Sequence, residues 1–116
     1  MTGALSGIKV IDLTSVVMGP YATQIMGDMG AEVIKVESPE GDIMRHMGVG
    51  RSKAMGPIHL AVNRNKKSLM LDLRQEAARS ALLRVIADAD VFVHAMRPAA
   101  IERLGLGYEQ VRKANP

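Results

Sequence analysis

The sequence contains no cysteine and no tryptophan, and its aromatic residues are two tyrosines and one phenylalanine. The absence of cysteine excludes disulfides, thiolate metal sites and cysteine nucleophiles, and it favours a reducing, cytoplasmic location. Because aromatic rings are the platforms on which bases stack, so few of them argue against nucleic acid as a partner. The three histidines, His46, His59 and His94, lack the spacing of metal ligands, so we expect no metal site.

Long apolar runs are also missing. No stretch approaches the roughly 20 residues that a membrane helix needs, and residues 1–8 lack the basic start and apolar core of a secretory signal. We therefore expect neither a membrane partner nor export. The formal net charge is +3, which suits an anionic small molecule as well as a larger partner.

The chain of 116 residues has the length of one domain, in which strand-like and helix-like segments alternate. Runs rich in β-branched residues predict strands at 7–13, 32–37, 68–73 and 90–95. Apolar spacing predicts helices at 20–29, 75–89, 98–103 and 108–113, with a loop or loose helical excursion at 43–60. Strands joined through helices pair in parallel, so the expected fold class is α/β. Ligands in such folds bind beyond the carboxyl ends of the strands, here at 14–19, 38–42, 74 and 95–98.

A dinucleotide-binding domain is one interpretation of this pattern, because Glu37 follows Gly19 by about the distance at which such domains place a ribose-binding acid. The glycine pattern does not fit, however. Gly19 stands alone, and Pro20 removes a backbone donor where the pyrophosphate would be held. The first strand is not followed by a phosphate-binding Gly-Lys-Ser/Thr either, so an NAD-dependent oxidoreductase is kept only as an alternative.

Several segments resemble, in order and spacing, the N-terminal part of family III CoA-transferases. They are "LSGIKVIDLT" with "GPYAT", "GDMGAEVIKVE", "NRNKKSLMLDL", "ADVFVHAMRP" and "IERLGLGYEQVRKANP". The family includes carnitine, bile-acid and formyl-CoA transferases and α-methylacyl-CoA racemase. The resemblance implies a Rossmann-like parallel sheet with flanking helices, forming the incomplete N-terminal part of a larger interlaced-dimer fold. Residues 1–116 would be its CoA-binding N-terminal portion.

The activity that the resemblance implies is transfer of CoA between an acyl-CoA and a carboxylic acid. CoA and acyl-CoA would be substrates, and no covalently bound cofactor is expected. The family's aspartate nucleophile would lie beyond residue 116, so we assign no catalytic residue here and expect the chain alone to be inactive. Two further functions stay open, namely an acyl-CoA racemase or isomerase of the same family and a non-catalytic CoA-binding module.

The resemblance also implies a set of CoA-binding positions: Val16, Val17, Met18, Leu71, Arg74, Ala95, Met96 and Arg103. Residues 16–18 would form a wall of the CoA site, and Gly19 would let the ligand approach the backbone. Leu71, Arg74 and Arg103 match positions near the adenine and its phosphates, where a guanidinium pairs two phosphate oxygens at once. Ala95 and Met96 replace an asparagine and an aromatic residue found in many members.

The remaining charged residues receive no catalytic role. Asp12 and Asp72 lie at predicted strand ends, where a structural hydrogen-bonding role is expected. Lys66 and Lys67 are interpreted either as a diffuse attraction for the charges of CoA or as protection of an exposed strand start.

Overall fold

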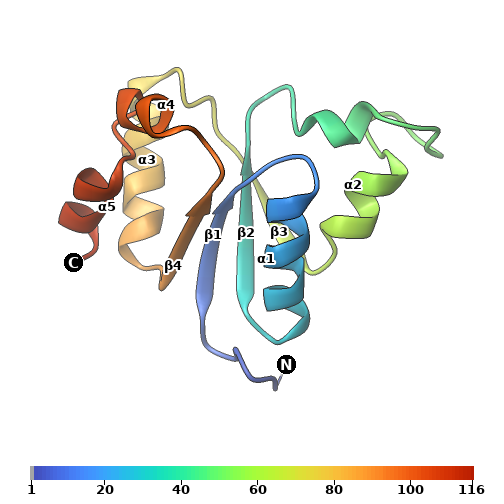
Figure 1. The fold of residues 1–116 in the computed structure, drawn as a ribbon, viewed down its shortest axis with the longest axis horizontal. Helices are drawn as coiled ribbons and strands as arrows, with labels where there is room; N and C mark the ends of the chain where they lie inside the picture. The colour runs from blue at the N-terminus through green and yellow to red at the C-terminus, as the bar shows by residue number, and fades with distance from the viewer. Residues whose placement is uncertain (1) are drawn as a thin grey trace.

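The fold is a parallel sheet of four strands with helices on both faces, as a computed structural model describes it for residues 2–116 (Figure 1). The strands are β1 (Lys9–Leu13), β2 (Glu32–Glu37), β3 (Lys66–Met70) and β4 (Val91–His94). The helices are α1 (Met18–Asp28), the short 3-10 helix η1 (Ile43–His46), α2 (Pro57–Val62), α3 (Glu76–Ala87), α4 (Pro98–Arg103) and α5 (Tyr108–Ala114). The predicted α/β class with a parallel sheet and flanking helices is confirmed.

The strand order is β3-β2-β1-β4, and every neighbouring pair is parallel. The chain runs outward from β1 through β2 to β3, then returns to place β4 on the other side of β1. This reversal makes a topological switch point between β1 and β4, and in open α/β sheets a crevice forms there at the carboxyl ends of the strands.

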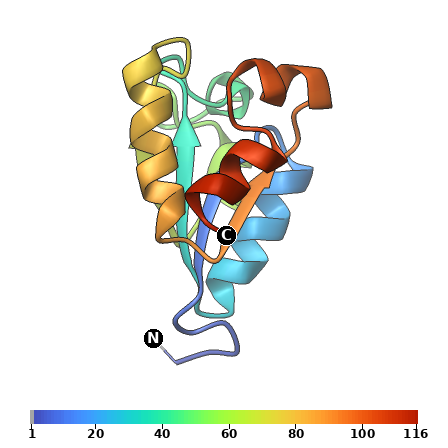
Figure 2. The same cartoon turned by 90° about the vertical axis from the view of Figure 1, so that its left-hand side faces the viewer.

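One face of the sheet is apolar and carries the larger core. Ile11 and Val36 from the strands pack with Leu82 and Ile86 from α3, and all four side chains are buried. Figure 2 shows α3 and α1 on opposite faces of the sheet, with α5 beside the β4 edge. The apolar side chains whose spacing predicted a helix at 75–89 therefore face the sheet.

The other face of the sheet lies under α1 and changes character along the strands. A small apolar cluster around Val10 and Val33 occupies its start. Because side chains two residues apart share a face, Asp12, Lys35 and Glu37 follow on the same side, and all three are buried. The carboxyl-terminal half of this face is consequently ionic and hydrogen-bonded.

The predicted boundaries differ most from the structure in two segments, while β1, α1, α3, β4 and α5 differ by one or two residues at their ends. Residues 43–60, interpreted as a loop or loose helical excursion, contain η1 and most of α2. The third strand covers 66–70 rather than 68–73, because Lys66 already pairs with Val33 of β2 and its ammonium is buried beneath the sheet. None of the helices within residues 2–116 is both long and apolar enough to cross a membrane.

Candidate functional site

Two adjoining cavities open at the carboxyl edge of the sheet, and together we call them the carboxyl-edge cleft. Their volumes are about 370 and 330 Å³. Both are lined by Leu13 at the end of β1, Glu37 and Ser38 at the end of β2, and Met96 after β4. The cleft therefore covers the switch point, where the fold predicts a ligand.

The second cavity is the more apolar part of the cleft. Leu71, Leu73, Met96 and Leu104 line it, and Arg74 stands at the same cavity. Three residues predicted from the family resemblance, Leu71, Arg74 and Met96, are thus brought together at one surface. An apolar hollow with a guanidinium beside it offers a place for a flat base and for an attached phosphate.

Arg74 is exposed and is at present neutralised by neighbouring carboxylates. Its Nε lies 2.8 Å from Asp72 Oδ1, and its Nη2 lies 3.4 Å from Glu40 Oε1. The Asp72 carboxylate raises the pKa of Arg74, so the guanidinium stays charged. Because its side chain is 72% exposed, it can exchange Asp72 for a ligand phosphate without losing much contact with the protein.

The other predicted positions do not line either cavity. Val16 and Val17 lie in the loop before α1 and Met18 is its first residue; all three are exposed, although their neighbours Thr14 and Ser15 border the larger cavity. Ala95 and Arg103 are also exposed, each next to a residue that lines the cleft. Their assignment to the CoA site stays a prediction.

Gly19 is required for packing, which the sequence alone did not indicate. A Cβ at this position would collide with the side chain of Thr14. The small residue is needed so that α1 can pack against the end of β1, independently of any ligand.

A buried ion pair borders the larger cavity, which its acidic member Asp42 helps to line. Lys35 Nζ is 3.0 Å from Asp42 Oδ2 and 3.1 Å from the backbone oxygen of Thr14. The Asp42 carboxylate also accepts hydrogen bonds from the backbone N–H groups of Val16 and Met44. Burial alone would raise the pKa of Asp42, but the Met44 amide and the Lys35 ammonium outweigh it and hold that pKa below its usual value.

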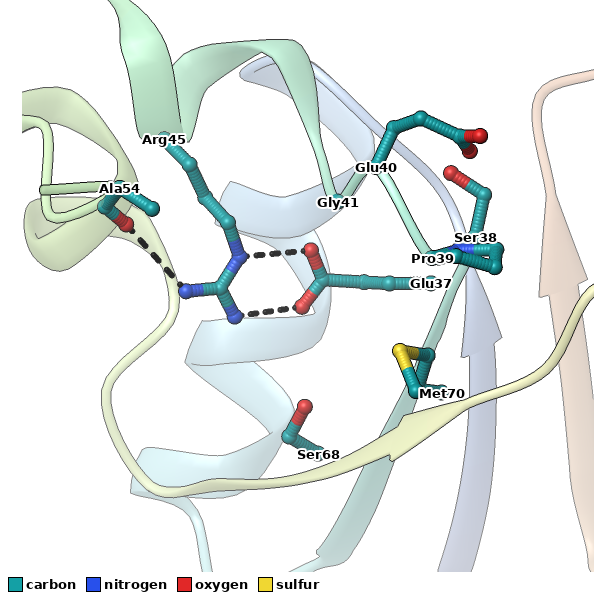
Figure 3. A pocket seen from close by; sticks show the side chains of 9 residues that line it. All are labelled: Glu37, Ser38, Pro39, Glu40, Gly41, Arg45, Ala54, Ser68 and Met70. Carbon is teal, nitrogen blue, oxygen red and sulfur yellow. Dashed lines mark hydrogen bonds and ion pairs between the residues drawn. The ribbon is translucent and has the colours of Figure 1, made fainter.

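Glu37 and Arg45 form a second pair, shown in Figure 3. Arg45 Nη2 lies 2.7 Å from Glu37 Oε1, and Arg45 Nε lies 2.8 Å from Oε2, which also accepts from the Asp42 amide. Burial opposes ionisation, yet these bonds lower the pKa of Glu37 to about 2. Both oxygens are occupied, so Glu37 is not free to hold a ribose as the dinucleotide interpretation requires.

Asp12 and Lys66 form a third pair, which corrects the interpretation of Lys66 as a surface charge. Lys66 Nζ lies 3.0 Å from Asp12 Oδ2 and also donates to the backbone oxygen of Pro20. Thr14 and Thr23 donate to the same carboxylate. Asp12 therefore has the structural role predicted for it, and Lys66 is its buried partner.

His59 lies among these cations and is buried in α2. Asn63 Nδ2 donates to the His59 backbone oxygen and lies 3.3 Å from His59 Nδ1, which accepts in the neutral ring. Burial, reinforced by the positive charge of Arg45, lowers the pKa of His59. The imidazole is thus held neutral in the folded chain.

We expect the chain to lose stability on mild acidification because of His59. A pKa below the ordinary value means that the unfolded chain binds the proton more tightly, so stability is present above about pH 6.5 and declines below it. Thermal unfolding measured between pH 7.5 and pH 5 should show this decline, and His59→Gln should make it shallower. An unchanged slope in the variant would contradict the assignment.

No group of three or more His, Asp or Glu side chains within residues 2–116 is arranged to hold a metal ion. What the fold and cleft define is a class of protein: a parallel α/β domain with a cleft at its switch point. Comparisons with known proteins define the class more narrowly. Residues 5–116 match CoA-transferase family III, and the chain belongs to this family.

Similar proteins support the same assignment. An acyl-CoA transferase of Fusarium pseudograminearum is 46% identical over 98% of this chain and 27% of its own length. A succinyl-CoA:mesaconate CoA-transferase of Haloarcula hispanica is 42% identical over 98% of the chain and 30% of its own length. The crystal structure of a CAIB/BAIF family protein from Brucella suis is 36% identical with a TM-score of 0.92, covering 100% of this chain and 32% of that one.

The chain spans roughly a third or less of the length of these relatives. A short-chain dehydrogenase/reductase family protein is 13% identical with a TM-score of 0.53, which is a likeness of fold alone. It therefore does not support the NAD-dependent alternative.

Proposed function

We propose that residues 1–116 form the CoA-binding portion of an enzyme that transfers CoA between an acyl-CoA and a carboxylic acid. Membership of CoA-transferase family III supports the reaction class. The observation that carries the proposal is the carboxyl-edge cleft, where Leu71, Met96 and Arg74 meet at the switch point of the sheet.

The cleft suits the adenosine end of CoA for physical reasons. The apolar walls at Leu71, Leu73 and Leu104 can bury a base, which favours binding by removing apolar surface from water. The Arg74 guanidinium can pair two oxygens of a phosphate group that extends from the bound base toward solvent. Arg103 lies on α4 next to Leu104 and makes no ion pair with any residue in 2–116, so its charge is available to a second phosphate.

We expect Arg74→Ala and Arg103→Ala each to weaken CoA binding by about 1–3 kcal/mol, because each removes a charge-assisted hydrogen bond to phosphate. Isothermal titration of CoA into the purified chain and its variants measures this directly. Arg64→Ala is the matched control, since Arg64 pairs with Asp28 at the opposite end of α1, and its affinity should be unchanged. Unaltered CoA affinity in both test variants would refute the phosphate-binding roles.

Transfer is favoured over racemisation because the similar proteins named above are transferases. Succinyl-CoA and mesaconate, which the name of the Haloarcula protein gives as its substrates, are reasonable first compounds to assay.

Further properties of the protein are proposed on the same grounds. A homodimer is supported by an exposed apolar stripe along α1 and its C-cap residue, made of Met18, Tyr21, Ile25 and Met29. The strand order supports the Rossmann-like description. The absence of cysteine supports a cytoplasmic location, and the residues present give no reason to add a covalent cofactor.

A further inference from the structure

We propose that Asp42, held by Lys35, is a positioning residue that fixes the loop after β1 in the shape that binds CoA. The inference rests on the proposed function, because Val16 and Val17 of this loop, with Met18 that follows it, are among the predicted CoA contacts. The hydrogen bonds from the Lys35–Asp42 pair to this loop all go to backbone atoms.

The loop contains a strained residue. Val16 has a φ of 73°, in the left-handed region where a β-branched side chain crowds its own backbone. Such a conformation persists only when surrounding contacts hold it, and it recurs at ligand-binding sites. The sequence places valine rather than glycine there, so the loop relies on those contacts.

The contacts come from the buried pair. The N–H of Val16 lies 3.2 Å from both oxygens of Asp42, and the Lys35 ammonium donates to the backbone oxygen of Thr14 at 3.1 Å. Hydrogen bonds therefore fix the backbone of Thr14 and of Val16, the residues on either side of Ser15. The side chains of Lys35 and Asp42 are only 3% and 1% exposed, so solvent screens their attraction little.

The same carboxylate also fixes a second segment that lines the larger cavity. Asp42 Oδ1 accepts from the Met44 N–H at 3.0 Å and so caps the start of η1. Ser15 and Ile43 border the cavity from the two tethered segments. One side chain thus sets the separation between the loop after β1 and the segment after β2.

A carboxylate is required because several donors converge on it. An asparagine offers one acceptor oxygen, and its NH₂ group would face the Lys35 ammonium or a backbone N–H. Asp42→Asn therefore releases Val16, which can then relax out of the left-handed region. Glycine adopts a positive φ without this cost, so Val16→Gly should make the loop less dependent on Asp42.

The experiment is a double-mutant cycle on CoA affinity, with folding of each variant checked by amide NMR spectra. We expect Asp42→Asn to weaken CoA binding about tenfold in the original sequence and about threefold or less when Val16→Gly is already present. Asp28→Asn is the matched control, because it removes an exposed carboxylate that pairs with Arg64 at the far end of α1. Its affinity should equal that of the unmutated chain.

Equal losses from Asp42→Asn in both backgrounds would overturn the proposal, because a merely structural role would not depend on residue 16. If Asp42→Asn fails to fold, scalar couplings of the unmutated chain decide: a positive φ and a protected amide at Val16 support the proposal, and a negative φ overturns it. Absence of CoA binding by the unmutated chain would contradict the proposed function instead. The Val16 measurements on that sample would still test whether Asp42 holds the loop.

Discussion

Asp12→Asn should lower the free energy of unfolding by about 3–5 kcal/mol, because it leaves the buried Lys66 ammonium without its charged partner. Asp12 is fully buried and the Lys66 side chain is 2% exposed. Burial lowers the pKa of Lys66, and the hydrogen bond and charge of Asp12 are the largest effects that oppose it. A loss of this size is a large part of the stability of a domain, which is typically about 5–15 kcal/mol.

Urea unfolding monitored by circular dichroism measures this loss. Glu32→Gln is the control, since it removes the carboxylate of an exposed pair with Lys67 and should change stability little. The double variant Asp12→Asn with Lys66→Met should recover part of the loss, because no unpaired charge then remains buried. If Asp12→Asn were no more damaging than Glu32→Gln, the buried pair would not have the structural role given to it.

The fold could be predicted from the sequence because its signals are local. Strand β2 and helix α4 have the predicted boundaries, since a β-branched run and a proline at a helix start act within a few residues. The two faces of the sheet also follow from alternation along each strand. Predictions of this kind need no knowledge of distant contacts.

The ionic face could not be predicted in the same way, because its partners are distant in sequence. Lys66 reaches Asp12 across 54 positions, and nothing in the "NRNKKS" segment distinguishes the buried lysine from its exposed neighbour Lys67. A signal was present nonetheless. Asp12, Lys35 and Glu37 interrupt otherwise apolar strands, and charges in such positions are seldom buried without a partner.

The candidate site was predicted in part for a related reason. The family resemblance, rather than any residue pattern, led to Leu71, Arg74 and Met96, which the fold brings to one cleft. The shape of the loop after β1 was not predictable, because valine is among the residues least expected at a positive φ. Its conformation depends on Asp42, a residue whose importance only the tertiary contacts reveal.

The three buried carboxylates predict that the chain is sensitive to strong acid. Asp12, Glu37 and Asp42 all have a pKa below the ordinary value. A lowered pKa means that the folded chain releases the proton more readily than the unfolded chain. The stability from each group is therefore present above the unfolded value and is lost as the pH falls toward the folded value.

Glu37 gives a measurable part of this loss, because its pKa falls from 4.5 to about 2. The shift corresponds to roughly 3 kcal/mol at neutral pH, of which about 2 kcal/mol should be lost between pH 7 and pH 3. Glu37→Gln lacks the titrating group, so it should be less stable than the original chain at pH 7 and should approach it in acid. Urea unfolding of both proteins at pH 7, 5, 4 and 3 measures the difference between their free energies of unfolding. A difference that stays constant over this range would show that the Arg45 guanidinium does not hold Glu37 ionised. Only a carboxylate that becomes protonated on acidification can make the difference shrink.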